Sequence, residues 1–174
     1  MLDGGVQAWK AAGHPLTSAA PAERRGSLTP HPREDIVVSA DWIRERLSDS
    51  RYALIDARPD DEYTGADNGM GGMVHPGHIP GAAQLYWERL LEAPDRPTYR
   101  DRETLRTLFV AAGATSSKTV VTYCMVGMRA SVTYFVARLL GYDARFYDGS
   151  WHDWGARTDL PYVSGNERGE PPRR

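Results

Sequence analysis

The chain has 174 residues, 41% of them hydrophobic and 25% charged, which is the composition of a folded globular protein. Its formal net charge of −2 gives no reason to expect nucleic acid or an anionic membrane as the main partner, and no apolar run approaches the ~18 residues of a membrane span. Residues 1–20 also lack the apolar core of a signal peptide, so we expect a cytoplasmic protein, whose single cysteine allows neither an internal disulfide nor a multi-cysteine zinc site.

The N-terminal segment repeats the spacing of a segment near the C-terminus. Residues 3–4 are Asp-Gly and Trp9 follows six residues after the Asp, and Asp148 precedes Trp154 by the same distance. A proline follows each tryptophan at nearly equal distance. We interpret the N-terminal copy as the closing segment of a preceding module, and the alternative is two unrelated Asp-Gly turns.

The chain divides into four expected parts. Between the two copies, a stretch rich in Ala, Pro, Arg, Ser and Glu lacks periodic apolar residues and is typical of a linker. The parts are the end of a preceding module at residues 1–17, a linker at residues 18–35, the main domain at residues 36–163 and a flexible tail at residues 164–174.

Within the main domain, short apolar runs alternate with segments of helical spacing. Ser39 and Asp101 stand where a side chain can cap the start of a helix, and Gly113 and Gly141 where a helix can end. This alternation predicts an α/β fold with a central, mostly parallel sheet flanked by helices. Strands are expected at residues 52–56, 82–86, 119–123 and 144–147, helices at residues 40–47, 101–112 and 130–140, and an irregular Gly-rich loop at residues 62–76.

Cys124 comes directly after the expected strand at residues 119–123 and just before an expected helix. In parallel sheets, ligands bind at the carboxyl ends of the strands, where Asp56 also falls. Gly127 permits unusual backbone dihedral angles, so the amides of residues 125–129 can turn inward around the sulfur, and the start of the helix adds positive potential. Both effects favour thiolate over thiol. We therefore predict that Cys124 is a nucleophile rather than a small buried apolar residue.

Five motifs resemble those of the rhodanese sulfurtransferases, particularly the tandem-domain thiosulfate and mercaptopyruvate sulfurtransferases. In chain order, they are residues 54–58 (Leu-Ile-Asp-Ala-Arg), Glu62 and Tyr63 with Gly65, residues 77–82 (Gly-His-Ile-Pro-Gly-Ala), the loop from Cys124, and residues 147–151 (Tyr-Asp-Gly-Ser-Trp). The resemblance implies a three-layer rhodanese-like α/β fold over residues 36–163, which form the catalytic domain. It also implies that residues 1–17 are the end of a first rhodanese-like domain.

The resemblance further implies a two-step transfer of sulfur. Cys124 attacks the outer sulfur of a donor such as thiosulfate or 3-mercaptopyruvate, and the resulting persulfide passes its sulfur to cyanide, a small thiol or a protein thiol. No metal and no organic cofactor are expected, because the loop amides stabilise the anionic persulfide. Cationic residues commonly follow the cysteine in thiosulfate-preferring members and Gly-Ser-Gly in mercaptopyruvate-preferring ones, whereas Met125 and Met128 fit neither pattern.

The expected site residues fall into four groups by role. For two of them the sequence leaves an alternative: Arg58 can instead form a structural ion pair with Glu62, and Trp151 can be a core residue. The groups are the catalytic nucleophile Cys124; the loop amides of Met125, Val126, Gly127, Met128 and Arg129; the candidates for binding substrate Arg58, Arg129 and Trp151; and the supporting residues Asp56, Glu62 and His78.

The sequence leaves three alternatives to sulfur transfer: a metal site, a phosphatase and a docking module. His75 and His78 are close in sequence, but a Pro-Gly pair between them breaks any helix and no carboxylate or cysteine cluster accompanies them, so we expect no metal. A cysteine-dependent phosphatase of rhodanese-like fold needs five residues between Cys and Arg, whereas four separate Cys124 from Arg129, and the smaller ring suits sulfur. A non-catalytic rhodanese docking module is the third alternative, although such copies generally lack the cysteine.

The expected partners are a small-molecule sulfur donor and a thiol or cyanide acceptor, with no nucleic acid and no membrane. Leu2, Val6 and Trp9 are apolar and belong to the segment assigned to a preceding domain. We expect them to contact a first rhodanese-like domain or to support self-association of the chain.

Overall fold

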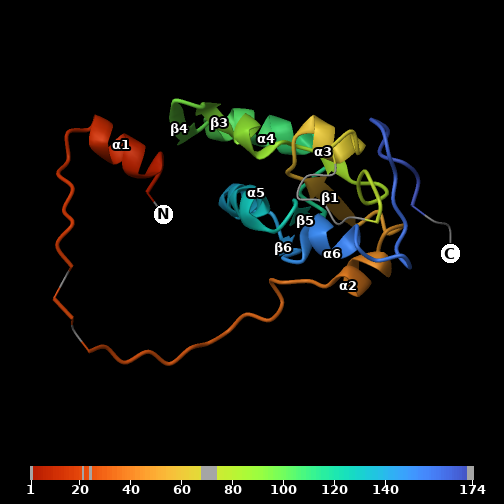
Figure 1. The fold of residues 1–174 in the computed structure, drawn as a ribbon, viewed down its shortest axis with the longest axis horizontal. Helices are drawn as coiled ribbons and strands as arrows, with labels where there is room; N and C mark the ends of the chain where they lie inside the picture. Colours follow the sequence, from red (N-terminus) through yellow and green to blue (C-terminus); the bar gives the residue numbers. More distant parts are fainter. Residues whose placement is uncertain (1, 21, 24, 68–73, 172–174) are drawn as a thin grey trace.

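The computed structural model describes residues 2–20, 22–23, 25–67 and 74–171 (Figure 1). Its helices and strands follow one another in the order α1 (Gly5–Ala11), α2 (Ala40–Arg44), β1 (Tyr52–Asp56), α3 (Asp60–Thr64), β2 (Ala83–Gln84), the 3-10 helix η1 (Trp87–Leu90), β3 (Leu91–Ala93), β4 (Arg96–Tyr99), α4 (Arg102–Ala111), β5 (Thr119–Tyr123), α5 (Met128–Leu140), β6 (Ala144–Phe146) and α6 (Ser150–Trp154).

The central sheet has the strand order β2-β1-β5-β6, and each neighbouring pair is parallel. Asp56 at the end of β1 pairs with Tyr123 at the end of β5, so the two strands end at the same level. Just beyond them, Ala57 N–H donates to the Tyr123 carbonyl oxygen at 2.9 Å. The predicted α/β fold with a parallel central sheet flanked by helices is confirmed, and the chain after β1 lies beside the chain after β5.

Both faces of the sheet are covered, because alternate residues of each strand point to opposite sides. Ile55 and Val120 are buried in one core cluster with Phe109 of α4 and residues of α5. Tyr123 is buried in a second cluster with Trp154 of α6 and residues of α2. In Figure 1, α4 lies above the sheet and α2 and α6 lie below it. The result is the three-layer arrangement that the sequence predicted.

Helix α3 is the main element that the sequence did not predict, since residues 62–76 were expected to be a loop. Three consecutive carboxylates occupy its first turn, where negative charge is favourable, and Pro59 precedes it with φ −65°. The helix ends at Gly65, whose φ of 83° suits glycine. Residues 68–73 of the predicted loop lie outside the described residues.

The hairpin of β3 and β4 was also not predicted. Its strands have three and four residues, and Pro97 within β4 disfavours a strand in sequence-based reasoning. The predicted strand at residues 82–86 is reduced to the two residues of β2, because η1 begins at Trp87. The two predicted helix caps are confirmed: Ser39 Oγ accepts from Trp42 N–H, and Asp101 accepts from two amides at the start of α4.

The N-terminal helix α1 lies beside the β3–β4 hairpin. Tyr99 N–H in β4 donates to Asp3 Oδ1 at 3.0 Å, and α1 itself contains no buried residue. The described residues between α1 and α2 lie in a long extended path along one side of the molecule (Figure 1). Leu2, Val6 and Trp9 are 53%, 57% and 37% exposed.

The two copies of the Asp-Gly repeat share two features of local geometry. Gly5 has φ 57° and the corresponding Ser150 has φ 54°, which makes Ser150 a rare left-handed residue other than glycine. Trp9 donates its indole N–H to the carbonyl oxygen six residues later at 2.9 Å, and Trp154 donates to the carbonyl oxygen seven residues later at 2.8 Å. The preceding glycines differ, since Gly4 has φ 72° and Gly149 has φ −55°, so the two segments share the left-handed residue and the tryptophan hydrogen bond but not the whole backbone conformation.

Residues 164–171, expected to be part of a flexible tail, lie against the domain. Gly165 N–H donates to the Thr64 carbonyl oxygen at 2.8 Å, and Gly81 N–H donates to the Arg168 carbonyl oxygen at 2.7 Å. The carbonyl oxygen of Glu167 is 3.1 Å from His78 Nε2. This segment thus connects the end of α3 with the chain before β2.

Within the described part of the chain, no helix is long and apolar enough to cross a membrane. The longest, α5, has 13 residues, whereas a membrane-spanning helix needs about 20.

Candidate active site

Cys124 lies at the carboxyl edge of the sheet, between β5 and α5. Its side chain is 0% exposed and packs with Ala57 and Ala130, while Trp87 and Phe146 lie against this group and are partly exposed. The sulfur is therefore at the strand-to-helix turn that the sequence predicted, enclosed by small side chains below and aromatic ones around it.

The loop after Cys124 has a set of unused backbone donors. Among the described residues, no hydrogen-bond acceptor faces the backbone N–H groups of residues 125–129. These are the amides that were expected to line the loop, at Met125, Val126, Gly127, Met128 and Arg129. Buried amides are rarely left without a partner, and several amides in one turn form a concave site for an anion. The loop is therefore suited to a negatively charged atom bound to Cys124.

Ser150 holds the loop in place from the start of α6. Its hydroxyl accepts the Cys124 N–H at 3.2 Å and donates to the Tyr147 carbonyl oxygen at 2.9 Å, and the residue is completely buried. Trp151 N–H also donates to the Cys124 carbonyl oxygen at 2.9 Å. Sequence reasoning used the motif at residues 147–151 for the family resemblance and missed this role, although a serine following Asp-Gly was the available signal.

Arg129 at the start of α5 forms a two-point ion pair with Glu62 of α3. Arg129 Nη1 is 2.8 Å from Glu62 Oε1 and Nη2 is 2.6 Å from Oε2. Burial is the largest single influence on Arg129 and lowers its pKa. The hydrogen bond and charge of Glu62 and the nearby Cys124 sulfur all raise the pKa, and together they outweigh burial, so the pKa of Arg129 is raised. Arg129 thus lies within reach of both the sulfur and Glu62.

The predicted pairing of Arg58 with Glu62 is wrong, because Arg58 pairs with Asp56. Its Nε and Nη2 atoms are 3.0 and 2.7 Å from the two carboxylate oxygens, and Nη2 also donates to the Gly77 carbonyl oxygen at 2.8 Å. Burial opposes the charge, but Asp56 outweighs it and raises the pKa of Arg58. The side chain is only 1% exposed. Arg58 and Asp56 therefore support the structure, and Arg58 is not available to bind substrate.

Trp151, the third candidate for binding substrate, also lies in the core. It is 1% exposed and contacts the Arg58 guanidinium, which lies 4.8 Å from its ring centroid. Because neither face is open to a ligand, the alternative role as a core residue is the correct one. Of the three candidates, only Arg129 lies at the sulfur.

His78 has a supporting role away from the sulfur. Its ring stacks on Tyr63 with centroids 3.7 Å apart, and Nδ1 is 2.8 Å from the Tyr63 carbonyl oxygen. Burial is the main cause that lowers the pKa of His78 and raises the pKa of Tyr63 to about 12. His75 instead stacks on Tyr162. In the described ranges, no three His, Cys, Asp or Glu side chains are grouped as metal ligands would be.

A three-layer parallel α/β domain with a cysteine in an amide-lined loop at the carboxyl edge defines the rhodanese class of protein. The chain belongs to this family: the profile of the Rhodanese-like domain matches residues 39–157. The matched range includes β1, β5, the Cys124 loop and α6, so it contains every part of the site described above.

Curated relatives extend over almost the whole chain. It is 35% identical to the sulfur carrier protein TtuD of Thermus thermophilus, over 96% of this chain and 62% of that protein. It is 34% identical to a thiosulfate sulfurtransferase of Azotobacter vinelandii, over 92% of this chain and 58% of that protein. The chain therefore spans about three fifths of the length of these relatives.

Solved structures show the same fold. The ergothioneine complex of an EanB variant has a TM-score of 0.85 and 26% identity, covering 95% of this chain and 41% of that one. The anaerobic ergothioneine biosynthesis enzyme of Chlorobium limicola, in complex with trimethyl histidine, has a TM-score of 0.81 and 27% identity with the same coverage.

Proposed function

We propose that this protein is a sulfurtransferase that moves a sulfane sulfur from thiosulfate or 3-mercaptopyruvate, through a persulfide on Cys124, to cyanide or a thiol. The observation that carries the proposal is the set of unused amides at residues 125–129 around a buried cysteine. A persulfide is anionic at neutral pH and extends from the cysteine by one atom. The loop donors can therefore stabilise its terminal sulfur without any other group.

In the first step, the Cys124 thiolate attacks the outer sulfur of the donor. A bond forms between Sγ and that sulfur, and the bond from the sulfur to the rest of the donor breaks, with its electron pair leaving on sulfite when the donor is thiosulfate. With 3-mercaptopyruvate the carbon–sulfur bond breaks and the carbon takes a proton, giving pyruvate. In both cases the unused amides of residues 125–129 face the negative charge that remains on the sulfur bound to Cys124.

In the second step, the acceptor attacks the terminal sulfur of the persulfide. The bond between the two sulfurs breaks and its electron pair returns to Cys124, which is again a thiolate. Cyanide gives thiocyanate, and a thiol gives a new persulfide. Neither step uses a metal or an organic cofactor.

The relatives support this proposal and the loop disfavours phosphate transfer. Four residues separate Cys124 from Arg129, and the guanidinium of Arg129 is directed to Glu62 instead of being free to bind phosphate oxygens. A docking module without activity does not require the unused amides. We also propose that residues 1–17 close a preceding rhodanese-like unit, which is supported by the left-handed residue and the tryptophan hydrogen bond that this segment shares with the α6 segment.

The proposal is tested by mass measurement of the intact chain. After incubation with thiosulfate or 3-mercaptopyruvate, we expect the mass of one added sulfur on Cys124, which cyanide removes as thiocyanate. Cys124→Ser should show neither the added mass nor thiocyanate, and its circular dichroism spectrum and unfolding curve serve as the folding control. Absence of the adduct with both donors would contradict the proposal.

A further inference from the structure

The only charged side chain in the loop at residues 124–129 is Arg129, and its charge is already neutralised. Both of its terminal nitrogens contact Glu62, at 2.8 and 2.6 Å. The two side chains are 25% and 14% exposed, so water screens this pair less than a surface pair. A small anion that approaches Cys124 therefore meets a neutral pair rather than a free guanidinium.

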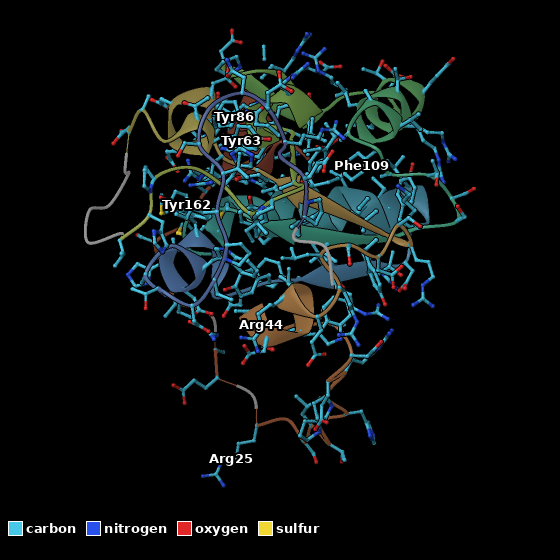
Figure 2. The ribbon with its side chains drawn as sticks, turned by 90° about the vertical axis from the view of Figure 1, so that its right-hand side faces the viewer. Arg25, Arg44, Tyr63, Tyr86, Phe109 and Tyr162 are labelled. Carbon is cyan, nitrogen blue, oxygen red and sulfur yellow. The ribbon has the colours of Figure 1, made fainter. Side chains whose placement is uncertain are left out.

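The surroundings of this pair are more acidic than basic. A hollow of about 540 Å³ is lined by residues of α3 and by residues on either side of Trp87. Asp60 and Asp61 belong to α3, the helix that also carries Glu62, and Trp87 packs against the buried group of Cys124, so the hollow adjoins the elements that hold the pair. Figure 2 shows Tyr86 and Tyr63 at the end of the molecule opposite Arg44 of α2. The lining residues are Pro59, Asp60, Asp61, Tyr86 and Arg89.

The charged side chains of the hollow and of the ion pair together sum to a negative value. The hollow contributes two carboxylates and one guanidinium, and the ion pair contributes one of each, which gives three carboxylates and two guanidiniums. Glu88, hydrogen-bonded to Tyr86, adds a further carboxylate. The thiolate of Cys124 adds one more negative charge. Residues 68–73, which the structure does not describe, have no charged side chain in the sequence.

The outer side of the loop adds no compensating positive charge. Met128 is 76% exposed and Val126 is 40% exposed, so the two most accessible side chains of the loop are apolar. Trp87 packs over the buried group that contains Cys124. A ligand that reaches the sulfur therefore contacts apolar side chains first and carboxylates beside them.

We propose that Glu62 determines donor specificity: by neutralising Arg129, it favours a sulfane sulfur carried by a neutral or cationic molecule over the thiosulfate dianion. This inference rests on the proposed sulfur transfer. The chemical step is unchanged, since the Cys124 thiolate bonds to the outer sulfur and the carrier leaves as a thiolate that takes up a proton. Only the cost of bringing the donor's charge to the site differs.

The experiment compares two donors that differ in net charge on the full chain. Thiosulfate carries two negative charges, whereas the ammonium group of cysteamine persulfide offsets its anionic persulfide, so this donor has no net charge. For each donor, the rate of sulfur addition to Cys124 and the value of kcat/KM are measured in the native chain, in Glu62→Gln and in Glu45→Gln. Gln at position 62 can still accept a hydrogen bond from Arg129 without its charge. Glu45→Gln is the matched control, because it removes one carboxylate next to α2 on the other face of the sheet.

For Glu62→Gln we expect kcat/KM with thiosulfate to rise about tenfold, mainly through a lower KM, and kcat/KM with cysteamine persulfide to stay the same or fall. Glu45→Gln should change neither value by more than about twofold. A second measurement needs no substitution: raising the salt concentration should increase kcat/KM of the native chain with thiosulfate and leave kcat/KM with cysteamine persulfide nearly unchanged.

The outcomes separate this inference from the proposed function. If both donors label Cys124 but Glu62→Gln changes them equally, or lowers both, and salt affects both alike, Glu62 has only a structural role and the inference is wrong. If neither donor labels Cys124, the sulfurtransferase proposal itself fails and the inference fails with it.

Discussion

Gly127 gives the Cys124 loop its shape, and no other residue fits at this position without distortion. Its φ is 87°, in the left-handed region that side chains disfavour. A Cβ atom there would lie 2.8 Å from Asp148 Oδ1 and 3.3 Å from the Asp148 carbonyl oxygen. The loop therefore packs against Asp148, just before α6. Two residues further on, Ser150 accepts a hydrogen bond from the Cys124 N–H.

Substitution of Gly127 should cost more than backbone strain alone. Gly141 is the matched control, because it has a similar φ of 91° and nothing lies within 4 Å of its Cβ position. We expect Gly141→Ala to lower the free energy of unfolding by about 1 kcal/mol and Gly127→Ala by about 2–3 kcal/mol, with slower sulfur addition to Cys124 only in the latter. Urea unfolding and the mass assay measure these effects. Equal losses in the two variants would show that the contact with Asp148 is unimportant.

Helices α1 and α6 begin with similar sequences but differ in burial, because only α6 packs on the central sheet. In α6, Trp151 and Trp154 are 1% and 0% exposed and form part of the core. The corresponding residues of α1, Val6 and Trp9, are 57% and 37% exposed. The Asp-Gly opening and the tryptophan hydrogen bond are present in both, so the local structure forms without burial, and only the tertiary partner differs.

This contrast predicts that the domain does not depend on α1. Because α1 contains no buried residue, removal of residues 1–16 should change the free energy of unfolding by less than about 1 kcal/mol. Light scattering at increasing concentration checks the expected self-association, which should occur in the full chain and be lost in the shortened one. If removal lowers the free energy of unfolding by more than about 2 kcal/mol, α1 is instead part of the domain. If the full and the shortened chain scatter light equally, α1 is not the association surface.

At the scale of the whole molecule, His78 connects three segments that are distant in sequence. Its ring contacts the carbonyl oxygens of Tyr63 and Glu167, and its backbone N–H donates to the Val163 carbonyl oxygen at 2.8 Å. Burial is the largest cause that lowers the pKa of this histidine from its ordinary value of 6.5. The neutral form is therefore the one that the folded protein accommodates.

The stability of the protein should fall as the solution becomes acidic. In the unfolded chain His78 takes up a proton near pH 6.5, whereas in the folded protein it does so only at lower pH, so its stabilising effect is present above pH 6.5 and is lost as pH falls below that value. We expect the free energy of unfolding to be about 1 kcal/mol lower at pH 5.5 than at pH 7.5 from this group.

Urea unfolding at the two pH values measures the difference, and His78→Asn is the comparison, since its amide can still donate to the Tyr63 carbonyl oxygen but does not titrate. The variant should be less stable at pH 7.5 and should have a smaller pH dependence. An unchanged pH dependence in the variant would assign the effect to other groups.

The sequence by itself was sufficient for the four strands of the central sheet, for helices α2, α4 and α5, and for the place of Cys124. These features depend on local physics: the period of apolar residues, the capping by Ser39 and Asp101, and the tolerance of glycine for left-handed dihedral angles. The alternation of strands and helices identified the carboxyl edge of a parallel sheet as the place where the cysteine lies. The short elements α3 and β3–β4 were missed because their formation depends on neighbours as much as on their own residues.

Only the tertiary structure decided which charges meet. The sequence suggested Glu62 as the ion-pair partner of Arg58, but in the structure Arg58 pairs with Asp56 and donates to the Gly77 carbonyl oxygen. That choice leaves Glu62 for Arg129, which is 67 residues away in sequence. This ion pair forms because α3 packs against the start of α5. The spacing of residues along the chain does not show that these two helices lie close together in the fold.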